Sequence, residues 1–260
     1  MALDVRHLHR LAGRYLVTWK ADGVRVLLYV DVNGTFLVNR RLEVRDLGDA
    51  LRGMGVEERR AVCPMVLDGE LVLASDGRTP VVWVYDALCV GGRSLRSLSM
   101  RARLVELVRI FEFMKAARSD VLLRRKGWWP VAEAARVWST LRRGPCDGLI
   151  LVSQEAPYVA GRDMEQYKWK DHITVDFFVT DKDELLLADE HPPPFGVLLN
   201  VEDAWRCNVV EAAWDQERGG WAALHVRRDK PRPNARDTFD ATWEAIRQRV
   251  GLAEIVAAAA

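Results

Sequence analysis

One lysine in the sequence stands where it could serve as a nucleophile. Lys20 follows the apolar residues 15–19 and precedes an Asp22-Gly23 pair, and a second β-rich run begins at Val24. This pattern predicts a strand, a tight turn and another strand, with Lys20 at the end of the first strand. A solvated lysine beside a hairpin turn would have the same surroundings, so the segment alone leaves both interpretations open.

The chemistry of a nucleophilic lysine sets demands on its neighbours. A lysine attacks a phosphorus atom only as a free amine, and the reference pKa of lysine is about 10.4. To be substantially neutral near pH 7, the lysine needs its pKa lowered by roughly three units, which corresponds to about 4 kcal/mol. Burial and nearby cations both favour the neutral amine. A nucleophilic lysine is therefore expected in a partly buried site with basic neighbours.

Further motifs accompany this lysine along the chain. Two more Asp-Gly pairs adjoin β-rich runs, in VLDGELVLA and CDGLILVS. An Asp-Gly pair alone is a common turn sequence, so each carboxylate could simply be a turn residue. The other motifs are VWVYDALCVGG at 82–92, KGWW at 126–129, YKWK at 167–170 and VRRDKPRPN at 226–234.

Taken in this order, the motifs resemble those of the covalent nucleotidyltransferase superfamily, which comprises mRNA capping enzymes and polynucleotide ligases. The later motifs are similar to capping enzymes in particular, because YVAGRDMEQYKWK leads into ITVDFFV and R-x-D-K-x-x-P-N spans residues 227–234. The spacing is compact, like that of stand-alone viral guanylyltransferases. The resemblance extends from about Leu8 to Val250.

The resemblance implies a covalent mechanism and a GTP site. Lys20 would be the catalytic residue, forming a phosphoramidate with GMP, expelling pyrophosphate and passing GMP to the 5′-diphosphate end of an RNA. The residues that would bind GTP are Arg25, Arg40, Glu70, Tyr85, Lys126, Asp147, Lys168, Lys170, Arg227, Asp229 and Lys230.

The nucleoside part of GTP is matched to residues of the first half of the chain. Arg25 and Arg40 would lie near the sugar or the RNA end, although Arg41 adjoins Arg40 and could be the true match. Tyr85 would stack on guanine, unless it is a core aromatic residue of its strand. Lys126 would donate to the O6 atom of guanine, because lysine has only donors to offer and adenine carries an amino donor there.

The phosphates and metal are matched to acidic and basic residues. Glu70 and Asp147 would serve Mg²⁺ or Mn²⁺, directly or through water. Lys168 and Lys170 alternate along a predicted strand, which places both on one face about 6.5–7 Å apart, suited to the α-phosphate. The last motif is matched to the β- and γ-phosphates. These would be held on a mobile domain by Arg227, Asp229 and Lys230, unless the three residues form a solvated charge run.

The elements that must position these residues include both strands and helices. Strand-like runs are predicted over residues 14–19, 24–30, 35–39, 65–74 and 80–90. A helix is predicted over SMRARLVELVRIFEFMKAARS, and a second helix from Pro130 to Gly144. Short strand-like runs recur around 196–200, 208–214 and 221–226. A terminal helix is predicted from an apolar stripe that runs from Phe239 to Val250. Residues 257–260 are expected to fray.

We therefore predict an α+β protein with an antiparallel-sheet nucleotidyltransferase domain over residues 1–172. A small C-terminal OB-fold β-barrel follows over residues 173–260, with a terminal helix that could pack back on the first domain.

The composition is that of an ordinary folded protein and does not identify binding partners. The 260 residues are 49% hydrophobic and 29% charged, with a formal net charge of +1. Residues 93–143 carry 13 basic and 4 acidic residues, whereas 144–217 carry 5 basic and 16 acidic ones. No apolar run approaches a membrane span of about 20 residues, and the N-terminus lacks the pattern of a signal peptide. The expectation is an intracellular protein that is neither secreted nor bound to a membrane.

Two alternatives share parts of this interpretation. An ATP-dependent DNA or RNA ligase would use the same lysine to seal strands, and a non-catalytic RNA-binding or scaffold protein would use the fold alone. No phosphatase loop, acidic tunnel or S-adenosylmethionine site is recognisable in the sequence. RNA triphosphatase and cap methyltransferase steps are therefore expected in separate partners.

Overall fold

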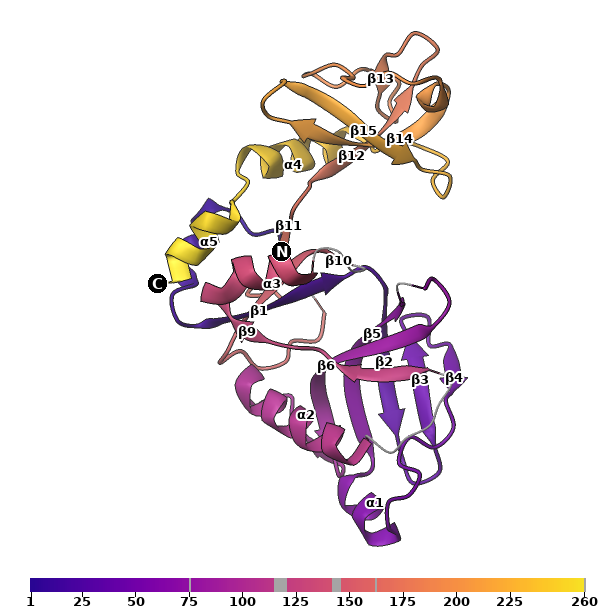
Figure 1. Cartoon of the computed structure of the whole chain (residues 1–260), viewed down its shortest axis with the longest axis vertical. Coiled ribbons are helices and arrows are strands. Elements are labelled where there is room, and N and C mark those ends of the chain that lie inside the picture. Colours follow the sequence, from indigo (N-terminus) through magenta and orange to yellow (C-terminus); the bar gives the residue numbers. More distant parts are fainter. Residues whose placement is uncertain (75, 115–120, 142–145, 162, 260) are drawn as a thin grey trace. The chain divides into compact units, whose positions relative to one another are not determined.

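The computed structural model describes residues 1–74, 76–114, 121–141, 146–161 and 163–259. The chain forms two compact units (Figure 1). Unit 1 comprises Met1–Trp169 and Gly251–Ala260, and unit 2 comprises Lys170–Val250. Both units combine helices with antiparallel sheet, so the α+β class predicted from the sequence is confirmed.

The larger sheet of unit 1 has seven strands in the order β4-β3-β2-β5-β6-β7, with β8 pairing in parallel to β6. Every other neighbouring pair is antiparallel. The strands are β2 (Val24–Val30), β3 (Thr35–Asn39), β4 (Val44–Asp46), β5 (Met65–Leu73), β6 (Pro80–Val90), β7 (Arg93–Ser94) and β8 (Leu122–Arg125).

One face of this sheet is the main core of unit 1. Alternate residues of β2, namely Val26, Leu28 and Val30, are buried there, as expected for a strand with one covered face. The helix α2 (Met100–Met114) contributes buried residues to the same core and packs on β6. The short helix α1 (Val56–Val62) has no buried residue.

The second sheet of unit 1 has the order β11-β10-β1-β9. Its strands are β1 (Tyr15–Ala21), β9 (Trp129–Pro130), β10 (Cys146–Ser153) and β11 (Tyr167–Lys170). The 3-10 helices η1 (Val5–Arg10) and η2 (Val131–Glu133) and the helices α3 (Ala134–Leu141) and α5 (Leu252–Ala259) accompany it. Helix α5 contacts η1, η2 and α3, which explains why the segment after unit 2 groups with unit 1.

The predicted hairpin around Lys20 is wrong. Strand β1 pairs with β9 and β10, whereas β2 pairs with β3 and β5, so the Asp22-Gly23 connection leads from one sheet to the other. A Cβ atom at Gly23 would lie 2.4 Å from the carbonyl oxygen of Leu71. Only glycine permits this close approach of the two sheets.

Unit 2 contains a four-stranded antiparallel sheet in the order β13-β12-β14-β15. Its elements are β12 (Thr174–Val179), β13 (Leu185–Leu186), β14 (Asn208–Asp215), β15 (Gly220–Val226), the 3-10 helix η3 (Asp203–Trp205) and α4 (Arg236–Arg247). An aromatic core of Phe177, Trp221 and Phe239 joins α4 to the sheet. This sheet occupies the region for which the OB-fold barrel is predicted.

The end of the chain differs from expectation. Helix α4 ends at Arg247, because Gln248 leaves the helical conformation, and Val250 lies beyond it. Residues 257–259 are not frayed but belong to α5, where Ala259 is buried. The run at 196–200 forms no strand; Leu198 makes an isolated bridge to Trp221. The predicted helix from Pro130 is divided into η2 and α3, and its expected end at Gly144 lies outside the described residues.

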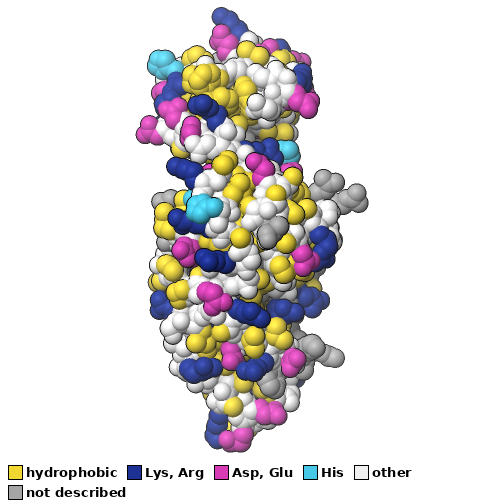
Figure 2. All heavy atoms as spheres, turned by 90° about the vertical axis from the view of Figure 1, so that its left-hand side faces the viewer, with side chains coloured by type: hydrophobic (Ala, Val, Ile, Leu, Met, Phe, Trp, Pro, Cys, Tyr) yellow, Lys and Arg dark blue, Asp and Glu magenta, His cyan; other side chains and the backbone are white. Residues whose placement is uncertain are grey.

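Two surface features bear on partners. Among the described residues, no helix is long and apolar enough to cross a membrane. On the face shown in Figure 2, Lys and Arg side chains lie among Asp and Glu side chains. The charges on that face are therefore mixed in sign.

Candidate active site

A pocket of about 450 Å³ in unit 1 is lined by residues of both its sheets. It collects residues that are far apart in the sequence. Seven of the twelve predicted site residues line it: Lys20, Arg25, Arg40, Glu70, Tyr85, Lys126 and Lys168. Arg41, the alternative to Arg40, does not line it.

Lys20 lies near the end of β1 and is paired with Asp147. The Lys20 Nζ atom is 2.7 Å and 2.9 Å from the two carboxylate oxygens of Asp147, on the neighbouring strand β10. The register of the two strands shifts here, because Lys20 faces Gly148 and Ala21 faces Cys146. Asp147 is therefore the extra residue of a β-bulge, and such bulges re-aim side chains. The bulge directs this carboxylate to the lysine.

Lys126 is a buried cation in the same pocket. Only 3% of its surface is exposed, and its ammonium lies 5.1 Å from the ring centre of Trp19 and 5.5 Å from that of Tyr85. Burial, together with the nearby Lys20, lowers the pKa of Lys126 to about 8, against the opposing effect of Glu70. The side chain makes no hydrogen bond to another described residue. Its donors are therefore available to a ligand in the pocket.

Gly127 and Thr18 hold this lysine in place. The Thr18 hydroxyl donates to the carbonyl oxygen of Gly127 at 2.7 Å, and the Lys126 backbone N–H donates to the carbonyl oxygen of Val84 at 2.8 Å. A Cβ atom at Gly127 would lie 2.3 Å from the Trp129 ring, so glycine is required beside the lysine.

Glu70 is half-buried on β5, opposite Arg25 in the strand register. Burial raises the pKa of its carboxyl, and the ammonium groups of Lys126 and Lys20 act in the opposite direction. Glu70 thus completes a group of two lysines and two carboxylates around one end of the pocket. Both carboxylates lie within strands, so the interpretation of Glu70 and Asp147 as turn residues is wrong.

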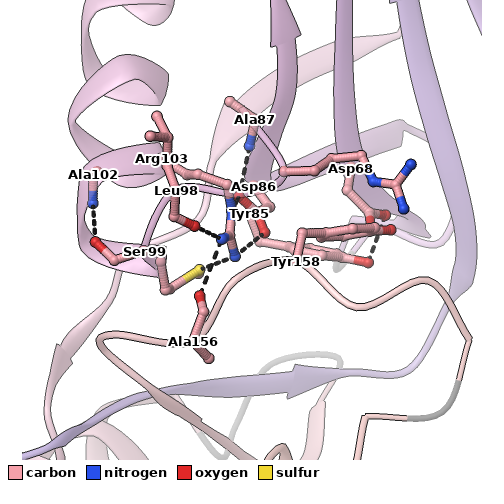
Figure 3. A network of polar contacts seen from close by, with 12 residues as sticks. Asp68, Tyr85, Asp86, Ala87, Leu98, Ser99, Ala102, Arg103, Ala156 and Tyr158 are labelled. Carbon is pink, nitrogen blue, oxygen red and sulfur yellow. Dashed lines mark hydrogen bonds and ion pairs between the residues drawn. The ribbon is translucent and has the colours of Figure 1, made fainter. Parts of the chain in front are cut away.

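A second polar group surrounds Asp68, whose side chain is fully buried (Figure 3). Arg25 Nε donates to Asp68 at 3.0 Å, and the hydroxyls of Tyr85 and Tyr158 donate to it at 2.7 Å and 2.9 Å. The terminal nitrogen of Arg25 also donates to Tyr158 at 2.5 Å. Burial raises the pKa of the Tyr158 hydroxyl to about 12 and that of Tyr85 further still. Both tyrosines therefore remain neutral donors to the carboxylate.

Tyr85 is also the extra residue of a bulge. Asp68 faces Asp86 and Gly69 faces Val84, so Tyr85 is left between the two pairs. Its ring lines the pocket while its hydroxyl binds Asp68, an anchoring that the sequence does not show. Its stacking on guanine stays a prediction.

The loop that carries Tyr158 is fixed by a buried ion pair. Arg103 of α2 binds Asp86 through Nε at 2.8 Å and a terminal nitrogen at 3.0 Å (Figure 3). The same guanidinium donates to the carbonyl oxygens of Leu98 and Ala156. Its Cζ atom lies 5.9 Å from the centre of the Tyr158 ring. The loop between β10 and β11 is thereby tied to α2 beside the pocket.

The two lysines of YKWK share the exposed face of β11, because Tyr167 and Trp169 are buried and Lys168 and Lys170 are exposed. Lys168 lines the pocket. Lys170 ends the strand and is the first residue of unit 2.

The last motif lies in unit 2, in a cluster around Asp176 of β12. One terminal nitrogen of Arg227 is 3.0 Å from Asp176 and 3.2 Å from Glu211, and Lys230 also pairs with Asp176. The other terminal nitrogen of Arg227 is 2.8 Å from Asp229, and this pairing lowers the pKa of the Asp229 carboxyl to about 2. The three predicted residues thus form one charged network with Asp176, in which Asp229 is exposed to solvent.

Comparisons with known proteins cover nearly the whole chain. The model of the mRNA capping enzyme catalytic domain matches residues 1–172, and that of the mRNA capping enzyme C-terminal domain matches residues 153–256. The chain belongs to the mRNA capping enzyme family. The resemblance seen in its motifs is therefore confirmed.

Curated capping enzymes are distant relatives. The mRNA-capping enzyme of Danio rerio is 24% identical over an alignment of 283 positions that covers 96% of this chain and 47% of the zebrafish protein. The alpha subunit of the Saccharomyces cerevisiae mRNA-capping enzyme is 23% identical, covering 94% of this chain and 73% of its own length. The chain thus spans about half the length of the zebrafish relative.

Solved structures show the fold. A mycobacterial DNA ligase D complexed with ATP and MES is 19% identical, with a TM-score of 0.52 over 85% of this chain and 92% of the ligase. The ligase domain of LigD from M. tuberculosis is 17% identical, with a TM-score of 0.51 over 84% and 91%. The capping-family chain therefore has the nucleotidyltransferase fold that ligases share.

Carboxylates near Lys20 could hold a divalent metal ion. Among the described residues, no group of three or more His, Cys, Asp or Glu side chains is arranged to hold a metal ion. Mg²⁺ commonly binds through one or two carboxylates, with water and substrate phosphates completing its shell. Glu70 and Asp147, which both lie close to Lys20, fit that second kind of site.

Three residues of this capping-family chain escaped the sequence interpretation. Asp68, Tyr158 and Asp176 each belong to a motif quoted for the resemblance, yet none was assigned a role. The hydrogen-bond partners of Asp68 and Tyr158 lie 17 to 133 positions away in the sequence. An aspartate in an otherwise apolar strand, as in ITVDFFV, was the available signal, since buried charges require partners.

Proposed function

We propose that the chain is a GTP:RNA guanylyltransferase that forms a covalent lysyl-GMP intermediate on Lys20. The observation that carries this proposal is Lys126, a buried lysine with available donors in the pocket that contains Lys20. A guanine O6 accepts from such donors, whereas the amino group of adenine would meet a second donor. This arrangement favours GTP over ATP.

The proposed reaction has two steps. Nζ of Lys20 bonds to the α-phosphorus of GTP, the bond from that phosphorus to the bridging oxygen breaks, and pyrophosphate leaves. An oxygen of the terminal phosphate of a 5′-diphosphate RNA then bonds to the same phosphorus, and the N–P bond breaks. Lys20 loses one proton before the first step and a second as the N–P bond forms, and it regains both when that bond breaks. Splitting one transfer into two lowers each barrier.

The other predicted site residues, in the pocket and in unit 2, have proposed roles in binding. Arg25, held by Asp68, and Arg40 would contact the sugar, and Tyr85 would stack on guanine. Lys168, together with Lys170, would hold the α-phosphate. The residues that would bind the β- and γ-phosphates are Arg227, Asp229 and Lys230.

Glu70 and Asp147 would hold Mg²⁺ or Mn²⁺. A bound divalent cation would neutralise charge on the phosphates.

The substrate chemistry implies other activities. A 5′-diphosphate RNA arises by removal of the γ-phosphate from a 5′-triphosphate end, so a triphosphatase must act first. A cap methyltransferase would act on the product. We propose that both reside in partner proteins, and that the protein acts inside the cell.

The decisive experiment is adduct formation with α-labelled GTP or ATP and MgCl₂, followed by denaturing electrophoresis and mass spectrometry. We expect a labelled band with GTP, placed on Lys20 and lost in Lys20→Ala. The matched control is Lys182→Ala, an exposed lysine of unit 2, which should label as the wild type does.

Two outcomes would support the alternatives. A band with ATP alone would indicate a ligase, an activity that the DNA ligase neighbours in structure make worth testing. The absence of any band from folded wild-type protein would favour a non-catalytic RNA-binding protein.

A further inference from the structure

Unit 2 contains a pocket of about 810 Å³ that none of the proposed GTP-binding residues lines. Three aromatic side chains and three basic ones define it: Phe195, Trp214, Trp243, His172, Arg247 and Arg249. All of them belong to unit 2. The pocket therefore exists within this unit alone.

The aromatic side chains form a rigid platform. The Phe195 ring stacks on Trp243 at 5.1 Å with 17° between the planes, and Trp214 meets Trp243 edge-on at 4.7 Å. Trp243 is fixed in turn against Trp221 and Phe239 in the core. Phe195 is 49% exposed. Because one face of its ring lies on Trp243, the exposed surface includes the opposite face.

The charged side chains that line this pocket are arginines. Its basic lining residues are His172, Arg247 and Arg249, and no carboxylate of a described residue lines it. The carboxylates of Asp171 and Glu244 lie near its edge, 3.3 Å from His172 and 3.8 Å from Arg247. Residues 170–250 as a whole carry 16 acidic and 11 basic residues, a net charge of −5. An arginine-lined pocket in a net acidic unit suits an anionic ligand.

The arginines keep donors for such a ligand. Arg247 is 3.8 Å from Glu244, a pair exposed to solvent. Arg249 donates to the backbone carbonyl oxygen of Asp171 and lies 3.8 Å from its carboxylate. A guanidinium has five N–H donors, so these contacts leave several unused.

We propose that this pocket binds single-stranded RNA, stacking a base on Phe195 and pairing backbone phosphates with Arg247 and Arg249. The proposal rests on the proposed function in that it supplies a second contact for the RNA that receives GMP. Aromatic faces beside cations bind single strands with little preference for sequence, because every base has a π-face.

An acidic peptide would also meet the arginines. It would not require a flat, half-exposed aromatic face supported from behind by a parallel indole, which matches a stacked base. RNA is therefore the occupant that uses both features of the pocket.

The test measures binding of fluorescein-labelled 12-nucleotide oligo(U) and oligo(A) with 5′-hydroxyl ends, which cannot accept GMP. The variants are Phe195→Ala and Arg247→Gln in the full chain. Phe195→Ala should weaken both oligonucleotides at least about fivefold, the lower limit for loss of one stacked base. Arg247→Gln should reduce the slope of log affinity against log salt by about 0.7.

Matched controls come from the same unit. Leu224→Ala removes a hydrophobic side chain that is 47% exposed and outside the pocket, and Arg218→Gln removes an exposed arginine of the β14–β15 turn. Both should bind RNA as the wild type does. Circular dichroism and thermal unfolding should show that all four variants fold.

Two outcomes would overturn the inference. One is that folded pocket variants and controls bind RNA equally well. The other is that the pocket variants lose affinity for a labelled Glu-rich peptide but not for RNA, which would assign the pocket to a protein partner. Adduct formation by the wild type with GTP is measured separately and needs no RNA. Failure of the RNA site therefore leaves the proposed function standing, and failure of adduct formation would refute the function itself.

Discussion

Lys126 is a buried lysine whose pKa is lowered by folding. Its pKa is about 8 in the folded chain against 10.5 as the ordinary value. Between these values the unfolded chain binds more protons than the folded one, so stability must rise with pH across that window. Below about pH 8 the lysine is protonated in both states and contributes a constant destabilisation.

We therefore predict that wild type gains about 2 kcal/mol of unfolding free energy relative to Lys126→Met between pH 7.5 and 9.5. Urea denaturation of both proteins at several pH values measures this difference in unfolding free energy. The comparison cancels other groups that titrate at alkaline pH, such as the cysteines. Parallel pH profiles for the two proteins would show that Lys126 is not held as the structure indicates.

Tyr158 joins Arg25 to the buried carboxylate of Asp68 through one hydroxyl. Removing that hydroxyl in Tyr158→Phe leaves Asp68 with fewer donors. The expected cost is about 1–3 kcal/mol of stability, as for hydrogen bonds to a charged group. The KM for GTP in adduct formation should also rise, because Arg25 is less firmly placed.

The control for this prediction is Tyr29→Phe, whose ring lies at the surface of β2. Tyr29→Phe should change neither the stability nor the KM for GTP. Equal behaviour of the two variants would mean that the Asp68 group does not position Arg25.

At the scale of elements, local patterns in the sequence were enough to predict most strands. Strands β2, β3 and β6 have the predicted bounds, because alternation of apolar residues and flanking turn residues are local properties. The two bulges were not predictable in this way. Asp147 and Tyr85 become extra residues only through the register of a partner strand. That register depends on contacts between distant segments.

The separation of β1 from β2 was missed for the same reason. A tight Asp-Gly turn between two β-rich runs is typical of a hairpin. Here the pairing of β1 with β10 and of β2 with β5 overrides that preference. The types of site residue could therefore be proposed from the sequence, whereas their anchors Asp68 and Asp176 required the structure.

Helix α5 contributes to the stability of unit 1 through Ile255, which is fully buried. Ile255→Ala should lower the unfolding free energy by about 2–5 kcal/mol, through lost burial and the cavity left behind. Ala257→Ser, at an exposed position of the same helix, should cost far less. Thermal and urea unfolding compare the two. An Ile255→Ala protein as stable as wild type would show that α5 is dispensable for unit 1.

At the scale of the whole molecule, the proposed reaction uses residues of both units. Arg227 should matter for the departure of pyrophosphate and not for the later transfer of GMP. Arg227→Ala is therefore expected to slow adduct formation about 10²-fold, as for loss of one donor that stabilises developing charge. Quenched-flow kinetics with labelled GTP measures this step, and Lys182→Ala serves as the control.

Loss of Arg227 also removes a partner of the buried Asp176. Arg227→Lys, which keeps the charge, and a check of folding by circular dichroism separate this effect from catalysis. Transfer of GMP from a preformed adduct to RNA should proceed at the wild-type rate. Equal slowing of both steps would contradict the assignment.

Unit 1 is built from two segments separated by the 81 residues of Lys170–Val250. Helix α5, which packs on η1, η2 and α3, is synthesised only after all of unit 2. Because domains tend to fold as units during translation, a ribosome-bound chain would carry unit 1 with Ile255 still missing. The order of synthesis thus delays completion of the domain that contains the Lys20 pocket until the other unit has been synthesised.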